Sequence, residues 1–301
     1  MMRLLQVIRA PFFTATVIPG LVGAALAWSE GRLHLGYLLL TVIGIICINA
    51  GTNTANDYFD HLSGNDAANQ ELTPFSGGSR FIQRGLVSPQ RMLALSLTSF
   101  AGGAIIGLYL AASRGWAILW IGLLGVIIGF FSSAPPLKLN YRGHGLGELA
   151  AGIGCGPLIV MGSYYVQAQR LTAEAFWVSL AVGFLVAAVL YINEFPDYAA
   201  DKAANKHTVV VLLGRERAVG GYVALLAAPY AIILVGVAVG LLPAALLISL
   251  LTLPLAWQGV QGVRKHHNDT VKLIPTNATT VQLNLVFGLL LCVGYAIARW
   301  A

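Results

Sequence analysis

The sequence predicts an all-α membrane protein, with nine transmembrane helices around a central cavity. Three observations predict this class: 57% of the 301 residues are hydrophobic, only 10% are charged, and the mean hydropathy is +0.75. Soluble domains carry about a quarter charged residues, so this composition excludes a water-soluble fold. Because unpaired backbone groups are not tolerated in lipid, each spanning segment must be helical.

Nine apolar stretches without Asp, Glu, Lys or Arg define the predicted spans, since a helix needs about 20 such residues to cross the hydrocarbon. They cover residues 10–28, 36–55, 92–112, 116–133, 149–167, 175–193, 218–239, 242–263 and 279–298. The first stretch resembles a signal peptide, but it is longer than a signal core and eight further stretches follow it. We therefore expect a single membrane domain over residues 1–301.

Basic residues predict the orientation, because cytoplasmic loops of membrane proteins carry an excess of Lys and Arg. With the N-terminus inside and nine crossings, the only outside members of the 18 Lys and Arg residues are Arg32, Arg114, Arg170 and Arg299, while Arg3 and Arg9 lie inside. The only outside members of the 12 acidic residues are Glu30 and Glu174. We therefore expect a multi-pass protein of the inner (plasma) membrane, with its N-terminus and its chemistry on the cytoplasmic side.

Two long inner connections, residues 56–91 and 194–217, stand out because the outer connections are short. Long loops in a compact protein are usually functional or disordered. We expect these two segments to form a cap over a cavity that opens to the cytoplasmic side.

The charge and the cysteines exclude other classes. The net charge of +6 and the pI of about 9.3 do not indicate a nucleic-acid partner, because the basic residues lie between apolar runs and form no single patch. Cys47, Cys155 and Cys292 stand in apolar runs without metal-site spacing, which argues against a disulfide scaffold and a zinc or iron–sulfur site.

Two acidic clusters follow two of the spans. Asn53, Asp57 and Asp60 are spaced i, i+4 and i+7, so a helix that continues past the second span places them on one face. After the sixth span, a second face carries Asn193, Asp197 and Asp201 at i, i+4 and i+8. This repetition predicts two four-helix units plus a ninth helix, with the two acidic faces meeting across the cavity.

Several carboxylates in one place destabilise one another unless a cation neutralises them. Carboxylate and amide oxygens suit Mg²⁺, which also binds substrate phosphates. Four basic residues lie near the clusters in the sequence: Lys138, Arg142, Lys202 and Lys206. A metal ion with Lys and Arg around a leaving diphosphate stabilises the charge that develops as a C–O bond breaks.

These residues allow other interpretations. A single acidic residue outside a span is usually a solvated loop charge, but two Asn-Asp faces at matching places favour metal–phosphate chemistry. A secondary transporter would place charged residues near mid-membrane, whereas every charge here lies outside the nine predicted spans. A phosphotransferase acting on CDP-alcohols would carry an Asp-Gly-x-x-Ala-Arg signature, and no such run occurs.

With these residues in hand, the sequence resembles the UbiA superfamily of intramembrane aromatic prenyltransferases over nearly its whole length. Asn56-Asp57-x-x-Asp60 matches the first Asp-rich motif of that family, and Asn193-Glu194-x-x-Asp197-x-x-x-Asp201 matches the second. Arg9-x-Pro11 before the first span also matches. Within the superfamily, the sequence is most similar to the branch that prenylates 1,4-dihydroxy-2-naphthoate in menaquinone synthesis.

The resemblance implies a polyprenyl diphosphate as donor, an aromatic acceptor, Mg²⁺ as cofactor and the lipid bilayer as surroundings. The implied catalytic residues are Asp57, Asp60, Asp197 and Asp201. The implied metal ligands are these four together with Asn53, Asp66, Asn193 and Glu194. The implied substrate-binding residues are Arg80, Gln83, Lys138, Tyr141, Arg142, Lys202 and Lys206.

The sequence departs from the family pattern at two site positions. Glu194 stands where the second motif commonly has Asp, and the third acid of the first motif falls at Asp66 instead of Gly64. The identity of the aromatic acceptor also stays open within the superfamily. The alternatives to the naphthoate are 4-hydroxybenzoate, homogentisate, haem, chlorophyllide and a glycerol ether.

Overall fold

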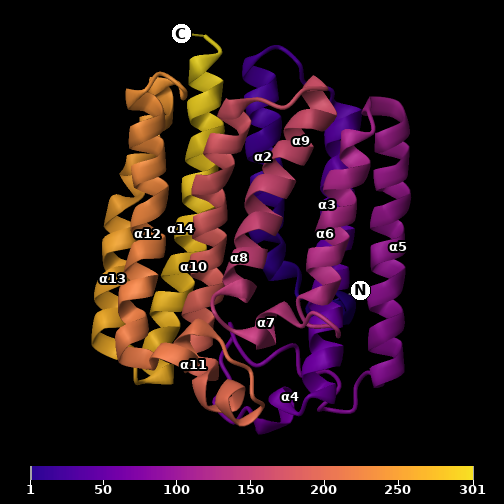
Figure 1. The fold of residues 1–301 in the computed structure, drawn as a ribbon, viewed down its shortest axis with the longest axis vertical. Helices are drawn as coiled ribbons and strands as arrows, with labels where there is room; N and C mark the ends of the chain where they lie inside the picture. Colours follow the sequence, from indigo (N-terminus) through magenta and orange to yellow (C-terminus); the bar gives the residue numbers. More distant parts are fainter. Residues whose placement is uncertain (1, 301) are drawn as a thin grey trace.

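The chain folds into a bundle of long helices that run side by side between two ends (Figure 1). The computed structural model describes residues 2–300, with side chains described for residues 5–9 and 12–300. The side chains of Arg3 and Pro11 thus lie outside the described residues. The N-terminal half contains α1 (Met2–Val7), η1 (Ala10–Phe13), α2 (Thr14–Ser29), α3 (Leu35–Leu62), α4 (Asn65–Ala68), α5 (Pro89–Arg114), α6 (Ala117–Phe131) and α7 (Leu139–Arg142).

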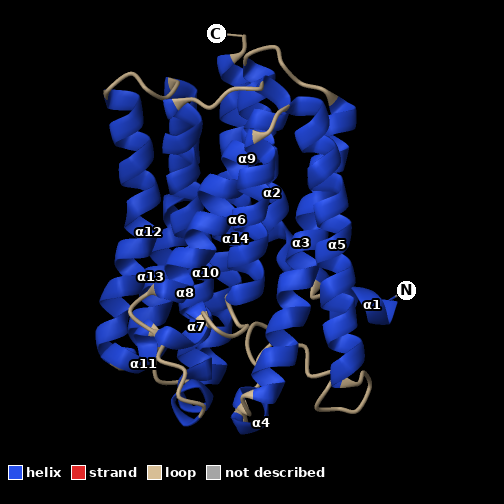
Figure 2. Ribbon diagram, turned by 45° about the vertical axis from the view of Figure 1, so that its right-hand side comes forward, coloured by secondary structure: helices blue, strands red, loops and turns tan. Residues whose placement is uncertain are grey.

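The C-terminal half continues with α8 (Leu146–Ile153), η2 (Gly154–Leu158), α9 (Ile159–Ala168), α10 (Ala173–Ala203), α11 (Val209–Leu213), α12 (Arg215–Ala238), η3 (Ala244–Thr252), α13 (Leu253–His266) and α14 (Thr270–Ala298). Figure 2 shows the loops gathered at the two ends of the bundle. The short helices α4, α7 and α11 all lie at one end, away from the C-terminus (Figure 1). We call this the motif end.

The apolar stretches of the sequence all lie on helices or on runs of consecutive helices. Within the described residues, seven segments are long and apolar enough to cross a membrane: α3, α5, α8–α9, α10, α12, η3–α13 and α14. The helices α2 and α6 are apolar but have only 16 and 15 residues. A spanning helix needs about 20 residues, so nine crossings stay a prediction.

The two predicted cap segments are partly helical. Residues 56–62 belong to α3, and α4 follows after a left-handed turn at Gly64 (φ 79°). In the second segment, α10 continues to Ala203 and α11 begins at Val209. Both motifs therefore stand on the last turns of long helices, as their spacing predicts, and only the connections beyond them are irregular.

The close packing of α10 against α8 and η2 depends on glycines. A Cβ atom at Gly156 would lie 2.6 Å from the carbonyl oxygen of Ser179 and 2.7 Å from the Cα of Gly183. Only glycine allows such an approach of two backbones, as is common where helices pack in membranes. This contact fixes α8, which begins at the motif end, against the helix that carries the second motif.

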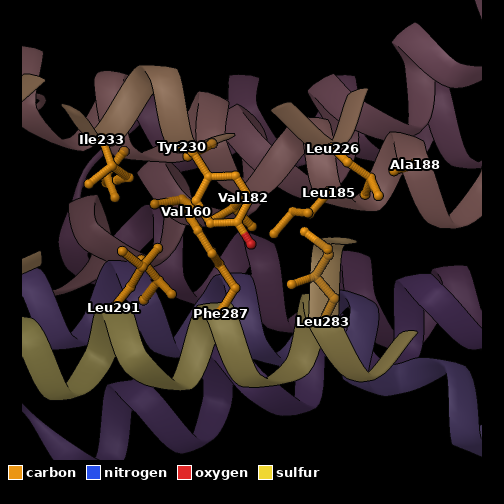
Figure 3. Packing of buried hydrophobic residues seen from close by; sticks show 14 of the residues in the cluster. Val160, Val182, Leu185, Ala188, Leu226, Tyr230, Ile233, Leu283, Phe287 and Leu291 are labelled. Carbon is orange, nitrogen blue, oxygen red and sulfur yellow. The ribbon is translucent and has the colours of Figure 1, made fainter. Parts of the chain in front are cut away.

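The packed core lies on one side of the bundle. Figure 3 shows Val182 and Leu185 of α10, Tyr230 of α12, and Phe287 and Leu291 of α14 in one cluster of buried side chains. The rings of Tyr230 and Phe287 meet edge to face, with their centroids 5.6 Å apart. Because lipid tails are as apolar as these side chains, dispersion contacts hold the helices together. The core anchors α10 and leaves the side formed by α3, α5 and α6 free to enclose a cavity.

Candidate active site

A cavity of about 640 Å³ lies between α2, α3, α5, α6, α8–α9 and α10. Along α10 its lining changes from apolar to acidic, from Val186 and Leu190 to Asp197 and Asp201. Along α3 it changes in the same direction, from Ile45 to Asp60. The cavity thus has an acidic mouth at the motif end and an apolar interior. A diphosphate and its hydrocarbon tail need these two environments.

The first motif is held by two side chains and one backbone N–H from three other segments. Asp57 pairs with Arg9 and accepts a hydrogen bond from the backbone N–H of Ser79 (3.2 Å). Asp60 accepts bonds from the Tyr141 hydroxyl (2.6 Å) and from the amide of Asn56 (3.0 Å). Asp57 and Asp60 are 2% and 6% exposed. Buried carboxylates of this kind need such partners.

The third acid of the first motif, Asp66, lies on α4. The amide of Gln83 donates to Asp66 Oδ2 (2.8 Å), and the guanidinium of Arg80 donates to the backbone carbonyl of the same residue. Burial, with the charges of Asp60 and Asp57, raises the pKa of Asp66 to about 7. A cation near this carboxyl would offset the charges of its neighbours and favour its ionised form.

The second motif contacts the segment that follows the first. Asp201 Oδ1 accepts a bond from the amide of Asn65 (2.9 Å), and Asp197 Oδ1 accepts one from the amide of Asn69 (2.7 Å). The ammonium of Lys206 lies 3.4 Å from Asp201 Oδ1 and 4.0 Å from Asp60 Oδ2. Lys206 therefore connects the two motifs. The structure brings both predicted acidic faces to one cavity, which all of their residues except Asp57 line.

Charges around Lys206 and Tyr141 fix their protonation. Burial by itself lowers the pKa of Lys206, but Asp201 and Asp60 raise it well above its ordinary value. Burial and the charge of Asp60 also raise the pKa of Tyr141 far above the usual range. Lys206 is therefore a permanent cation at the mouth, and the Tyr141 hydroxyl is a permanent donor.

The residues at the mouth fit Mg²⁺ by their chemistry. No group of three or more His, Cys, Asp or Glu side chains within the described residues is already gathered as a metal site. The motifs nevertheless present only oxygen donors, which are the ligands that Mg²⁺ prefers. Asp57 Oδ2 and Asp201 Oδ2 are buried without a hydrogen-bond partner in the described structure, and such oxygens are costly unless a cation or donor arrives.

Several residues singled out by sequence do not reach the cavity. Lys138 lies over the ring of Tyr141 (5.6 Å), Lys202 lies over the ring of Tyr198 (5.9 Å), and exposed Arg142 donates to the carbonyl of Pro136 (3.0 Å). None of the three lines the cavity. They remain near the mouth as surface cations, whereas Lys206 lines the cavity and its side chain is only 13% exposed.

The two motif asparagines line the cavity but already have partners. The amide of Asn53 donates to Asn49 (2.8 Å) and to the carbonyl of Ile8 (3.2 Å). The side-chain oxygen of Asn193 accepts a bond from Asn277 (2.7 Å). The oxygen of Asn53 is thus the freer of the two as a ligand.

Sequence reasoning missed four residues at this site: Arg9, Asn65, Asn69 and Glu148. Arg9 carries a signal in the Arg9-x-Pro11 match, which does not by itself predict that its guanidinium pairs with Asp57. Asn65 and Asn69 flank Asp66 at i−1 and i+3, and their amides reach the second motif. Glu148 is the one acidic residue immediately before the fifth predicted span, and it lines the cavity.

Comparison with known proteins agrees with this geometry. A model of the UbiA prenyltransferase family matches residues 16–274. The 1,4-dihydroxy-2-naphthoate octaprenyltransferase of Bacillus subtilis is 30% identical over 298 residues, which cover 97% of this chain and 92% of the relative. The 2-carboxy-1,4-naphthoquinone phytyltransferase of Synechocystis is 28% identical over 302 residues, which cover 99% and 93%.

Solved structures share the fold. A UbiA homologue from Archaeoglobus fulgidus, bound to DMAPP and Mg²⁺, has a TM-score of 0.68 at 16% identity and covers 96% of this chain and 99% of its own. The apo UbiA homologue from Aeropyrum pernix has a TM-score of 0.68 at 20% identity and covers 94% and 97%. The match of the family model over most of the sequence, on a helical bundle with this site, places the chain in the UbiA prenyltransferase family, as a multi-pass membrane prenyltransferase similar to the 1,4-dihydroxy-2-naphthoate octaprenyltransferases.

Proposed function

We propose that this protein transfers a polyprenyl group from an allylic diphosphate to 1,4-dihydroxy-2-naphthoate, with Mg²⁺ as cofactor, and so forms a demethylmenaquinone-type lipid. The C–O bond between the prenyl group and the diphosphate breaks, and a C–C bond to the aromatic ring forms. The prenyl group replaces the carboxylate of the naphthoate, which leaves as carbon dioxide.

One observation carries this proposal: two Asp motifs meet at the mouth of a single cavity whose interior is apolar. Asp60, Asp197 and Asp201 line the mouth together with Lys206, and Ile45 and Val186 lie further inside. This order matches a donor with a diphosphate head and a hydrocarbon tail. The naphthoate acceptor is supported by the relatives in Bacillus subtilis and Synechocystis, which act on naphthalene-ring acceptors by their names.

Each group at the mouth has a proposed task. Asp57, Asp60, Asp197 and Asp201 would hold the metal, with Asn53, Asp66, Asn193 and Glu194 around them. When bound, Mg²⁺ neutralises the charge that develops on the leaving diphosphate. Lys206 lies between the motifs and would hold the remaining diphosphate charge.

The segment after the first motif, residues 65–83, would close the mouth and exclude water. Asn65 and Asn69 bind it to the second motif, and Gln83 and Arg80 bind it to Asp66. An allylic cation that meets water is hydrolysed, so the mouth has to be closed while the cation exists. Gln83 and Arg80 would act here by ordering the segment.

The membrane arrangement belongs to the same proposal. The helices α2 and α6 would cross the bilayer with the seven longer segments, which gives nine crossings. The motif end carries most of the Lys and Arg residues, so it would face the cytoplasm of a cell whose inner membrane holds the protein.

The test uses purified protein in detergent with Mg²⁺, all-trans octaprenyl diphosphate and 1,4-dihydroxy-2-naphthoate, and mass spectrometry of the extracted lipid. We expect a demethylmenaquinol-type product that disappears with EDTA and returns with excess Mg²⁺. Parallel reactions contain 4-hydroxybenzoate, homogentisate or 2-carboxy-1,4-naphthoquinone. Product from one of these alone would overturn the naphthoate assignment, and no product with any acceptor from folded protein would overturn the whole proposal.

A further inference from the structure

Two buried glutamates lie in the cavity: Glu194 belongs to the second motif, whereas Glu148 lies outside both motifs. Glu148 stands in the first turn of α8 and is 8% exposed, and Glu194 stands on α10 and is 6% exposed. Both line the cavity. The helices that carry them are closely packed, since a Cβ atom at Gly152 of α8 would lie 3.3 Å from the carbonyl oxygen of Gly183 of α10, and the charge of Glu148 reaches Glu194. The two carboxylates therefore form a pair, brought together by the close packing of α8 and α10.

Each member of the pair has an unsatisfied oxygen. Glu148 Oε1 and Glu194 Oε2 are buried without a hydrogen-bond partner in the described structure. Glu194 has a backbone partner at Val210, which leaves its other oxygen open. A buried carboxylate oxygen without a donor is costly, so the pair lacks a group that brings hydrogen-bond donors.

A purely structural role for Glu148 does not explain its burial. An acidic residue in the first turn of a helix is stabilised by the helix dipole, and Glu216 occupies the equivalent turn of α12. Glu216 is exposed to solvent, whereas Glu148 faces the cavity. The dipole therefore accounts for an acid in this turn but not for one inside the cavity.

The level of the pair along α10 indicates which part of the substrates it meets. On α10, Glu194 precedes Asp197 by three residues, which is a rise of about 4.5 Å along the axis. It thus lies between the acidic mouth and the apolar lining that begins at Leu190. With the diphosphate at the mouth and the tail inside, the reacting carbon of the donor lies at this same level.

Glu148 lies outside both motifs, and its carboxylate by itself repels the diphosphate anion. The aromatic acceptor has to approach the reacting carbon and carries phenolic hydroxyl groups, which are the donors that Glu148 and Glu194 lack. We infer that Glu148, supported by Glu194, binds a phenolic hydroxyl of the acceptor and so directs its ring toward the donor. This inference rests on the function proposed above and names the acceptor subsite of that function.

The hydrogen bond has two consequences. It fixes the acceptor ring at the boundary level, with its apolar faces against the lining formed by Ala151 and Leu190. A hydroxyl that donates to a carboxylate also makes its ring more electron-rich, which favours attack on an allylic cation. Acceptors without a hydroxyl at the matching position gain neither effect.

The test measures the steady-state kinetics of four proteins: wild type, Glu148→Gln, Glu148→Asp and Glu216→Gln. Geranylgeranyl diphosphate and 1,4-dihydroxy-2-naphthoate are varied separately at saturating Mg²⁺. We expect Glu148→Gln to raise the KM for the naphthoate about 10-fold or more, because it loses a charge-assisted hydrogen bond, with the KM for the donor unchanged within about twofold. Glu148→Asp should restore part of the loss, and the matched control Glu216→Gln should equal wild type.

A second measurement keeps the inference falsifiable if the variants fold poorly. Wild-type protein is assayed with naphthoates in which one hydroxyl is methylated, and loss of binding on methylation at one position is expected. Equal use of every methylated acceptor would overturn the inference. So would a Glu148→Gln protein with normal KM for the naphthoate, or one in which the donor and Mg²⁺ dependence change instead. Wild-type protein without any product would overturn the proposed function itself, which separates the two failures.

Discussion

The acidic residues at the two ends of the bundle have different partners. At the end that contains the C-terminus, Glu30 has its charge fully offset: Arg170 lies 2.8 Å from it, and the Tyr164 hydroxyl donates to both of its oxygens (2.8 and 3.0 Å). At the motif end, the acidic residues outnumber Arg9 and Lys206, and buried oxygens stay without partners. The first arrangement is complete in itself, and the second is complete only with a bound cation.

This contrast distinguishes structural charges from functional ones. At the C-terminal end, Arg114 donates to the carbonyls of Val166 and Gln167 (2.7 and 2.9 Å) and joins α5 to α9. Polar groups at that end hold neighbouring helices together. At the motif end, polar groups line an open cavity. Substitutions at the first end should therefore change stability, and substitutions at the second should change activity.

The largest effect is expected at the motif aspartates. Asp57→Asn, Asp60→Asn, Asp197→Asn and Asp201→Asn should each lower kcat/KM by about 100-fold or more, because groups that stabilise developing charge contribute on this scale. Product formation by mass spectrometry measures the loss, and size-exclusion profiles in detergent check that the proteins are folded. Near-normal turnover in two of these variants would contradict the assignment of the mouth as the metal–diphosphate site.

The second effect separates the lysine that lines the cavity from a surface lysine. Lys206→Gln should lower kcat/KM by roughly 10- to 100-fold, because the cation between Asp60 and Asp201 is lost. Lys202→Gln should have a clearly smaller effect, since Lys202 is exposed and lies outside the cavity. Equal losses from both substitutions would show that distance from the cavity does not decide which cation acts.

A moderate effect is expected in residues 65–83, the segment that follows the first motif and contacts the second. Asn69→Ala removes the amide that donates to Asp197, so the closing segment should bind the second motif less firmly. We expect a several-fold rise in hydrolysis of the donor relative to transfer, because water reaches the mouth. The ratio of free prenyl alcohol to coupled lipid measures this, and an unchanged ratio would contradict a closing role.

The smallest effect on activity is expected at the C-terminal end. Tyr164→Phe removes the hydroxyl that donates to Glu30 and should destabilise the protein by about 1–2 kcal/mol, as expected for loss of a buried hydrogen bond to a charged group. The protein that stays folded should keep its kcat. Thermal unfolding in detergent together with kcat tests this, and a fall in kcat at full stability would contradict the separation of the two ends.

Sequence patterns predicted most of the fold and half of the site. Apolar runs located every long helix, because lipid leaves a chain few alternatives to helix. The i, i+4 spacing of Asn53, Asp57 and Asp60 placed these residues on one face, because helical periodicity is local. The charged and polar partners of the carboxylates were harder to predict, because they come from distant parts of the chain. Asn65, for example, is 136 residues from Asp201, to which it donates.

The roles of Lys206 and Glu148 could not be predicted from the sequence, because they depend on tertiary packing. Lys202 and Lys206 look alike beside the second motif, yet only Lys206 turns into the cavity. Glu148 carries no motif, and its place opposite Glu194 depends on the glycine contact of η2 with α10. Such tertiary contacts decide which of many similar charges become functional.

The central claim is that the two motifs form one binding site for a metal–diphosphate complex. The most direct measurement is the binding of inorganic diphosphate by titration calorimetry, with and without Mg²⁺, to wild type, Asp57→Asn and Asp201→Asn. The account predicts Mg²⁺-dependent binding to wild type that each substitution weakens by about 10-fold or more. Full binding in either variant, or equally strong binding without Mg²⁺, would contradict a site shared by the two motifs.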